Sequence, residues 1–132
     1  MSQENVEIVR RVFDAFNRRD IAAFIELLDR DVEWVPVLAV LEGSVYRGHA
    51  DIRRWIKDLD TDWEFFEVYY EELRDLGDRV LVFGHWRARG RASGIEVENP
   101  GTYLYEINGG KVVSMRTFTD RVEAFEAAGL SE

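Results

Sequence analysis

The sequence predicts an α+β domain in which helices come first and a sheet built of hairpins follows. Apolar residues recur at helical spacing up to residue 59, and from residue 63 onward they alternate with polar residues, as in strands. Turn sequences at 77–78, 93–94 and 108–110 separate the successive strands. Helices and strands in separate parts of a chain favour α+β over a parallel sheet of alternating strands and helices.

Three helices and one strand are expected in the first part of the chain. The first helix ends near 17–19, and Asp20 is placed to cap a short second helix that stops at 29–31. A strand follows over 32–35 and ends at Pro36, because proline cannot donate a ladder hydrogen bond. Residues 37–47 are interpreted as a loop or mobile lid, and the third helix follows residues 47–49.

Four antiparallel strands are expected from residue 63, and a short helix around Val122 and Phe125 follows them. The register of the first of these strands, 63–75, stays open because both of its faces are apolar. Two sets of residues compete for its interior face: Trp63, Phe65 and Tyr69, or Phe66, Val68 and Tyr70.

Composition and charge limit the possible functions. The 132 residues suit one domain, taken as 1–132, and 46% apolar residues are enough for a core and a pocket. A net charge of −9 disfavours nucleic acid and anionic membranes, and no apolar run is long enough for a membrane helix, so we expect a cytoplasmic protein. With no cysteine and two distant histidines, His49 and His85, no metal site is expected. No nucleotide-binding fingerprint occurs, so no cofactor is expected.

The turn lengths predict which residues of the last three strands share a face. A two-residue turn at 93–94 places Arg89 opposite Glu98 and Arg91 opposite Glu96. A two-residue turn at 109–110 fixes the last strand, and only an odd-length loop or a bulge would reverse its faces. The predicted inner face contains Val80, Val82, Gly84, Trp86, Ala88, Asn99, Gly101, Tyr103, Tyr105, Ile107, Val112, Ser114, Arg116, Phe118 and Asp120.

The predicted outer face of the sheet is too apolar for a surface that meets only water. A sheet face of this kind is commonly covered by a second copy of the chain, so a symmetric homodimer through this face is expected. The outer face contains Leu81, Phe83, His85, Leu104, Val113, Met115, Thr117 and Thr119.

Five strings of the sequence carry a family resemblance: Val12–Asp20, Asp31–Trp34, Arg47–Arg53, Gly110–Val113 and Arg116–Asp120. In this order and spacing they resemble the SnoaL-like branch of the nuclear-transport-factor-2-like, cystatin-like α+β cone superfamily, over nearly the whole chain. The resemblance implies a curved, mixed or antiparallel sheet wrapped around N-terminal helices, a conical pocket, and dimerisation through the sheet. Relatives include polyketide cyclases, ketosteroid isomerases, dehydratases, epoxide hydrolases and non-catalytic binders, so the resemblance does not fix a reaction.

The resemblance also implies a role for Asp120. It matches the aspartate that ends the last strand in SnoaL-type cyclases, where it serves as the acid/base. Other catalytic groups of the superfamily are missing here. Trp34 and Val35 stand where steroid isomerases have an aspartate base, and Phe13 stands where they have a phenol.

Asp120, Arg116 and Tyr103 form the predicted catalytic group. An apolar cavity raises the pKa of a carboxyl group and a nearby guanidinium lowers it, which suits proton transfer. Tyr103 or Arg116 would then stabilise a developing oxyanion. The alternative interpretation is that Asp120 caps the last helix or pairs with Arg116. The further candidate ligand-binding residues are Trp34, Trp55, Trp86, Asn99, Tyr105, Phe118 and His49.

Two functions fit these residues. The first is a cofactor-independent acid/base enzyme of the cyclase, isomerase or hydrolase type that uses Asp120. The second is a non-catalytic binding module in which Arg116, Tyr103 and Asn99 orient the guest. In both cases the expected partner is a small, largely apolar organic molecule that bears a carbonyl or hydroxyl group.

Overall fold

The six strands of the molecule form one curved sheet, and a computed structural model describes it over residues 2–130. The helices are α1 (Ser2–Asn17), α2 (Ile21–Glu26), α3 (Val37–Glu42), α4 (Gly48–Asp62) and α5 (Arg121–Ala127). The strands are β1 (Leu28–Val35), β2 (Tyr46–Arg47), β3 (Trp63–Asp75), β4 (Arg79–Gly90), β5 (Glu96–Asn108) and β6 (Lys111–Phe118).

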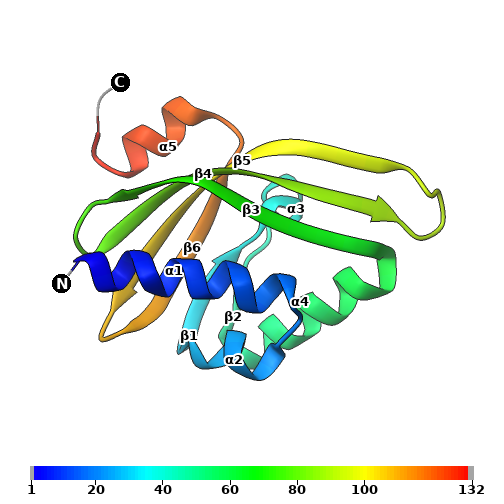
Figure 1. Ribbon diagram of the computed structural model, residues 1–132, viewed down its shortest axis with the longest axis horizontal. Coiled ribbons are helices and arrows are strands. Elements are labelled where there is room, and N and C mark those ends of the chain that lie inside the picture. The colour runs from blue at the N-terminus through cyan, green and yellow to red at the C-terminus, as the bar shows by residue number, and fades with distance from the viewer. Residues whose placement is uncertain (1, 131–132) are drawn as a thin grey trace.

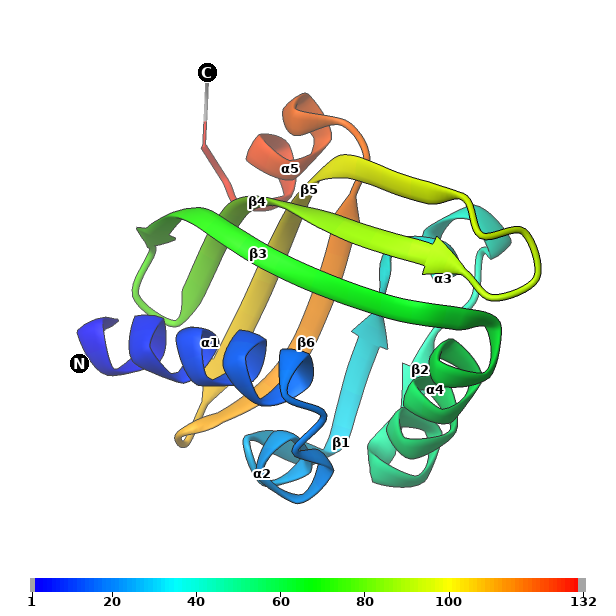
Figure 2. The same cartoon turned by 45° about the vertical axis from the view of Figure 1, so that its right-hand side comes forward.

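The sheet curls around the N-terminal helices, as the α+β cone prediction requires. Its strand order is β2-β1-β6-β5-β4-β3, and β3 to β6 are antiparallel neighbours as predicted. Strand β1 runs parallel to β6, so the sheet is mixed. Helices α1 and α4 lie on the concave side, and α5 lies on the opposite face (Figures 1 and 2). The main apolar core therefore fills the space between α1, α4 and the inner face of the sheet.

Local signals confirm several of the expected elements. The side chain of Asp20 accepts a hydrogen bond from the Ala23 amide and caps α2, as predicted. The segment 37–47, expected as a loop or lid, contains the two-residue strand β2 and helix α3. Gly43 ends α3 in the left-handed conformation, with φ of 69°. In β3 the open register is settled: Phe66 is buried in the main core and Tyr70 contacts Phe13 edge-on.

The β4–β5 hairpin keeps the predicted faces but not the predicted pairs. The Gly90 amide donates to the Ile95 carbonyl at 3.1 Å, so the loop between the strands is longer than two residues. Arg89 consequently lies opposite Glu96, not Glu98. The shift is even, and side chains alternate along a strand, so Trp86 and Tyr103 still face inward.

The predicted faces of β6 are wrong beyond its first residues. The Gly109–Gly110 turn pairs Ile107 with Val112 as expected, but the next pair is Glu106 with Ser114. One extra residue in β6 makes a bulge, and a bulge exchanges the two faces of a strand. Beyond it, Tyr105 lies opposite Met115 and Tyr103 opposite Thr117. Met115 and Thr117 were predicted to face outward, yet both are buried and line the interior.

Helix α5 covers part of the outer face that was predicted to meet a second copy. Leu81, Phe83 and Leu104 pack against Ala124, Phe125 and Ala128 in a second, smaller core. The Arg79 side chain donates to the carbonyls of Ala127 and Ala128 and so fixes the end of α5. These apolar residues of the outer face are therefore buried within a single chain.

The tightest backbone approach in the sheet is at Gly84. A Cβ atom at this position would lie 1.9 Å from the backbone carbonyl oxygen of Tyr69, beside the irregular step of β3 between Tyr70 and Glu72. Gly84 pairs with Gly101 on β5, so the curved centre of the sheet contains two adjacent residues without side chains. The close approach of β3 to β4 at this point therefore requires a glycine.

We expect Gly84→Ala to lower the free energy of unfolding by about 3 kcal/mol or more, because backbone must move to accept the methyl group. Gly90→Ala is the matched control. Its Cβ would meet the Ser93 hydroxyl at 2.8 Å, a side chain that is able to rotate away, so the cost should stay near 1 kcal/mol. Urea denaturation measures both values. Equal costs for the two variants would contradict the assigned role of Gly84.

Candidate active site

A cavity lies inside the cone, between the inner face of the sheet and helices α1, α3 and α4. Its volume is about 40 Å³, enough for water but far below the 300–1,000 Å³ typical of pockets that hold drug-sized ligands. Its wall is formed by Val12, Phe13, Phe16, Phe24, Trp34, Pro36, Val37, Leu38, Trp55, Leu59, Phe66, Val68, Tyr103, Tyr105, Met115 and Thr117.

Half of the lining residues of this wall are aromatic, and several of their rings contact one another. Phe16 stacks on Trp55 with ring centroids 5.3 Å apart, and Trp34 lies 5.6 Å from Trp55. Phe13 contacts the rings of Tyr103 and Tyr105 at 5.9 and 6.1 Å. Such ring contacts add to the free energy of burial, so the wall is firmly packed where it is aromatic.

Among the described residues, two buried hydrogen-bond donors in the wall have no protein partner. They are the Trp34 indole nitrogen Nε1 and the Tyr103 phenol oxygen Oη. Burial raises the pKa of the Tyr103 phenol well above its ordinary value, and it raises that of Tyr105 as well. Both phenols therefore keep their protons at neutral pH. The Thr117 hydroxyl, in contrast, is turned toward the Met115 sulfur at 3.8 Å.

Within the part of the chain that the structure describes, no ionisable group other than the phenols lines the cavity. The wall contains no Asp, Glu, His, Lys or Arg. Groups that titrate near neutral pH are the usual proton-transfer catalysts, and the described residues of this wall include none.

Four of the predicted site residues line the cavity: Tyr103, Tyr105, Trp34 and Trp55. The prediction missed the other twelve lining residues, which are Pro36 and residues of α1, α2, α3, α4, β3 and β6. The helical spacing of Phe13 and Phe16 identified them as core residues, but spacing does not show which part of a core is hollow. Met115 was missed because the bulge in β6 has no sequence signal.

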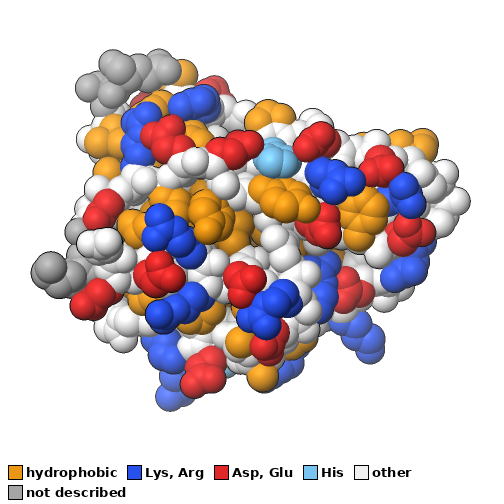
Figure 3. Space-filling model, in the orientation of Figure 1, with side chains coloured by type: hydrophobic (Ala, Val, Ile, Leu, Met, Phe, Trp, Pro, Cys, Tyr) orange, Lys and Arg blue, Asp and Glu red, His pale blue; other side chains and the backbone are white. Residues whose placement is uncertain are grey.

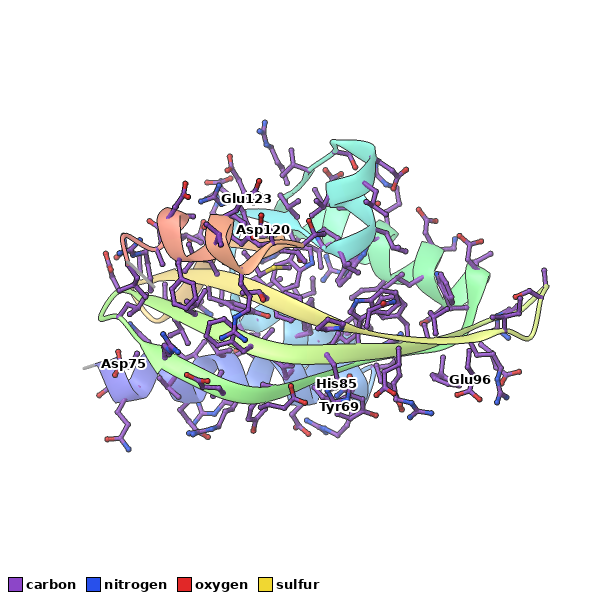
Figure 4. All side chains as sticks on the ribbon, turned by 90° about the horizontal axis from the view of Figure 1, so that it is seen from above. Tyr69, Asp75, His85, Glu96, Asp120 and Glu123 are labelled. Carbon is purple, nitrogen blue, oxygen red and sulfur yellow. The ribbon has the colours of Figure 1, made fainter. Side chains whose placement is uncertain are left out.

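The predicted inward positions of Asp120, Arg116 and Phe118 are wrong. Arg116 lies opposite Leu104, on the outer side of the bulged strand, and Phe118 packs against the outer core. Asp120 is exposed and accepts a hydrogen bond of 2.8 Å from the Val122 amide, so it caps α5. Figure 4 shows it at the start of α5, which lies on the opposite side of the sheet from α1. The alternative interpretation of Asp120 as a helix cap is the one that the geometry supports.

Three further candidate residues lie inside or beside the cone without lining the cavity. Trp86 is on the inner face, stacked on Phe66 at 5.2 Å. Asn99 pairs with Trp86 but is exposed toward the end of the hairpin. The His49 ring nitrogen Nε2 is 2.9 Å from the Leu28 carbonyl oxygen, which ties the start of α4 to β1. His49 therefore joins α4 to β1 and does not line the cavity.

The described residues, 2–130, hold no cluster of three or more His, Cys, Asp or Glu side chains arranged to bind a metal. Across the same residues, no helix combines the length and apolar character needed to cross a membrane.

A curved sheet wrapped around an N-terminal helix and an aromatic cavity defines the NTF2-like class of α+β cone. The chain belongs to the SnoaL-like domain family, whose profile matches residues 9–115. This confirms the resemblance seen in the sequence. No curated protein sequence matches the chain significantly.

Solved structures share the fold over nearly the whole chain. TerC, co-crystallised with polyporic acid, is 26% identical with a TM-score of 0.78, covering 96% of this chain and 98% of TerC. An NTF2-like protein of unknown function from Burkholderia pseudomallei is 23% identical, with a TM-score of 0.78 and coverage of 93% and 95%. A protein with a ketosteroid isomerase-like fold from Catenulispora acidiphila, in complex with trimethylamine, is 19% identical, with a TM-score of 0.77 and coverage of 95% and 94%.

We expect Asp120→Ala to lower the free energy of unfolding by about 1 kcal/mol, because α5 loses its cap. Asp120→Asn keeps an oxygen that accepts from the Val122 amide, so its stability should stay close to that of the wild type. Thermal denaturation followed by circular dichroism compares the three proteins. If Asp120→Asn were as destabilised as Asp120→Ala, the capping role would be incorrect.

Proposed function

We propose that the chain is a binding module for a small, largely apolar organic molecule, which it holds inside the cone. The observation that carries this proposal is the aromatic cavity, whose wall contains unpaired donors but no charged side chain. Pockets of this composition, apolar with a few placed polar groups, are typical of small-molecule sites. TerC, which is 26% identical and was co-crystallised with polyporic acid, supports the same kind of function.

Binding is favoured over acid/base catalysis by the identity of the polar groups in the wall. A general base must be deprotonated at the working pH before it can accept a proton. Burial raises the pKa of both Tyr103 and Tyr105, so their phenols stay protonated. Their phenols can donate hydrogen bonds but not remove protons at neutral pH. Asp120, the base expected from the sequence, caps α5 on the outside.

The ligand needs more room than the cavity offers in this state, and α3 is the part of the wall best able to move. Val37 and Leu38 of α3 face the cavity, whereas Leu41 is 77% exposed. The helix lies between Pro36, which provides no side-chain cap, and Gly43. Apolar packing and backbone bonds hold it, so an outward shift of α3 enlarges the cavity without breaking an ion pair between the described side chains.

A homodimer is part of the proposal, through the outer face of β3, β4 and β5 that α5 leaves uncovered. Positive and negative side chains alternate there with apolar ones (Figure 3). Tyr69 stacks on His85 at 4.8 Å, and His85 lies within 3.3 Å of Glu71 and Glu98 (Figure 4). A two-fold axis would bring each patch against its own copy, where mixed charges are self-complementary.

The proposed function is tested by titrating the protein with tetralin, an uncharged bicyclic hydrocarbon, in a calorimeter. We expect saturable binding of one molecule per chain. Val12→Phe puts a ring into the cavity and should weaken binding at least tenfold, since the ring takes the ligand's place. Val122→Phe makes the same change on exposed α5 and should leave the affinity unchanged. Absence of binding by both tetralin and its ketone 1-tetralone, or equal tetralin affinity in both variants, would reject the proposal.

The dimer is tested by sedimentation velocity. The wild type should sediment as a dimer, and His85→Glu should sediment as a monomer, because a third carboxylate would join Glu71 and Glu98 on both copies. Leu41→Glu, at an exposed position of α3, is the control and should remain dimeric. A monomeric wild type would end the dimer proposal, and a dimeric His85→Glu protein would move the interface to another face.

A further inference from the structure

Two donors in the cavity wall indicate the chemistry of the ligand. Trp34 and Tyr103 are only 3% and 5% exposed, yet Nε1 and Oη have no hydrogen-bond partner in the protein over the residues that the structure describes. Buried polar groups are nearly always paired, so each exception calls for an explanation. An indole N–H can only donate, and the Tyr103 phenol keeps its proton, so what both groups lack is an acceptor.

These donors belong to one continuous wall. Trp34 of β1 lies opposite Met115 of β6, and Met115 lies opposite Tyr105 of β5. Tyr103, two residues from Tyr105 on the same strand, projects from the same face. A ligand inside the cone therefore meets both donors from one side. Trp86 also has an unpaired Nε1, but it lies beside the cavity and does not line it.

The position of the Tyr103 phenol depends on Gly101. A Cβ atom at residue 101 would lie 2.3 Å from Oη, so the ring can lie across the backbone only because this residue is glycine. The Phe13 ring contacts Tyr103 edge-on at 5.9 Å and holds it from the other side. The donor is thus placed before the ligand arrives, which lowers the entropy cost of binding.

Charge in the ligand is disfavoured by the same wall. A carboxylate or ammonium group that leaves water needs an opposite charge, and the lining residues supply none. An uncharged acceptor, such as a ketone or quinone oxygen, loses less hydration and matches donors that carry no formal charge.

We infer that Tyr103 and Trp34 select the ligand, which is an uncharged aromatic molecule with a carbonyl-type acceptor oxygen directed at the wall formed by β1, β6 and β5. This inference rests on the proposed binding function and adds the chemical class of the ligand. Tyr103 and Trp34 are its specificity-determining residues.

The test compares tetralin with 1-tetralone, which differs by one ketone oxygen, and with 1-naphthoate, which is anionic at pH 7. Calorimetry should show 1-tetralone binding about tenfold more tightly than tetralin, the gain expected from one neutral hydrogen bond. It should bind at least tenfold more tightly than 1-naphthoate. If tetralin binds and 1-tetralone has the same affinity, the inference fails and the binding function stands. If neither binds, the proposed function itself fails. Preference for 1-naphthoate would overturn the uncharged class.

Substitutions of the two donors test whether the preference for 1-tetralone over tetralin depends on them. Tyr103→Phe and Trp34→Phe should each reduce the ratio of 1-tetralone to tetralin affinity at least threefold, because each removes one donor. Both ligands are measured on the same variant, so a change in the room of the cavity affects both affinities and leaves the ratio to report the donor. Tyr69→Phe removes a phenol that donates to Glu67 on the outer face and should leave the ratio unchanged. Full preference in both cavity variants would overturn the assignment. The wild-type ligand series decides the ligand class even if Trp34→Phe fails to fold.

Discussion

Strand β6 has one residue more than β5 between the pairs Ile107–Val112 and Glu106–Ser114, and the cavity depends on this extra residue. Side chains alternate along a strand, so the bulge turns Met115 and Thr117 inward and Arg116 outward. An unbulged strand would place a guanidinium inside a space walled by aromatic rings, where it would lose hydration without a counter-charge. The inward position of Met115 and Thr117, the outward position of Arg116 and hence the uncharged wall follow from this one irregularity.

The helices keep the sheet closed around the cavity by pairing with its edge. Strand β3 is an edge strand, and the Asn17 amide at the end of α1 bonds to both the N–H and the carbonyl of Val68. Arg19 donates to the Phe66 carbonyl and reaches Asp60 of α4, which joins both helices to the same edge. These side chains occupy ladder groups that would otherwise be open to another strand. They also hold α1, and with it Phe13 and Phe16, against the cavity.

The sequence predicts those features that depend on periodicity and fails on those that depend on single-residue irregularities. The order of elements, the Asp20 cap and the inner face of β4 follow from spacing and turn chemistry. The predicted pairing of β4 with β5 is wrong by two residues. Because this shift is even, the side chains of both strands still lie on the predicted faces. The bulge in β6 shifted the strand by one, and Arg116 and Asp120 were placed on the wrong face. Apolar Leu81 and Phe83 were assigned to a dimer because spacing cannot show that α5 folds back over them.

The two donors without a protein acceptor carry an energetic cost in the fold. A buried donor without a partner costs about 1–3 kcal/mol, a sizeable share of the 5–15 kcal/mol that stabilises a typical domain. Thr117 shows that a hydroxyl in this wall can turn toward a weak protein acceptor, the Met115 sulfur. The Tyr103 hydroxyl cannot turn toward a protein acceptor in the same way, because its ring is confined between Gly101 and Phe13. The Tyr103 phenol is held away from the protein acceptors of the described chain, so under the proposed function its hydrogen bond to a guest contributes to affinity.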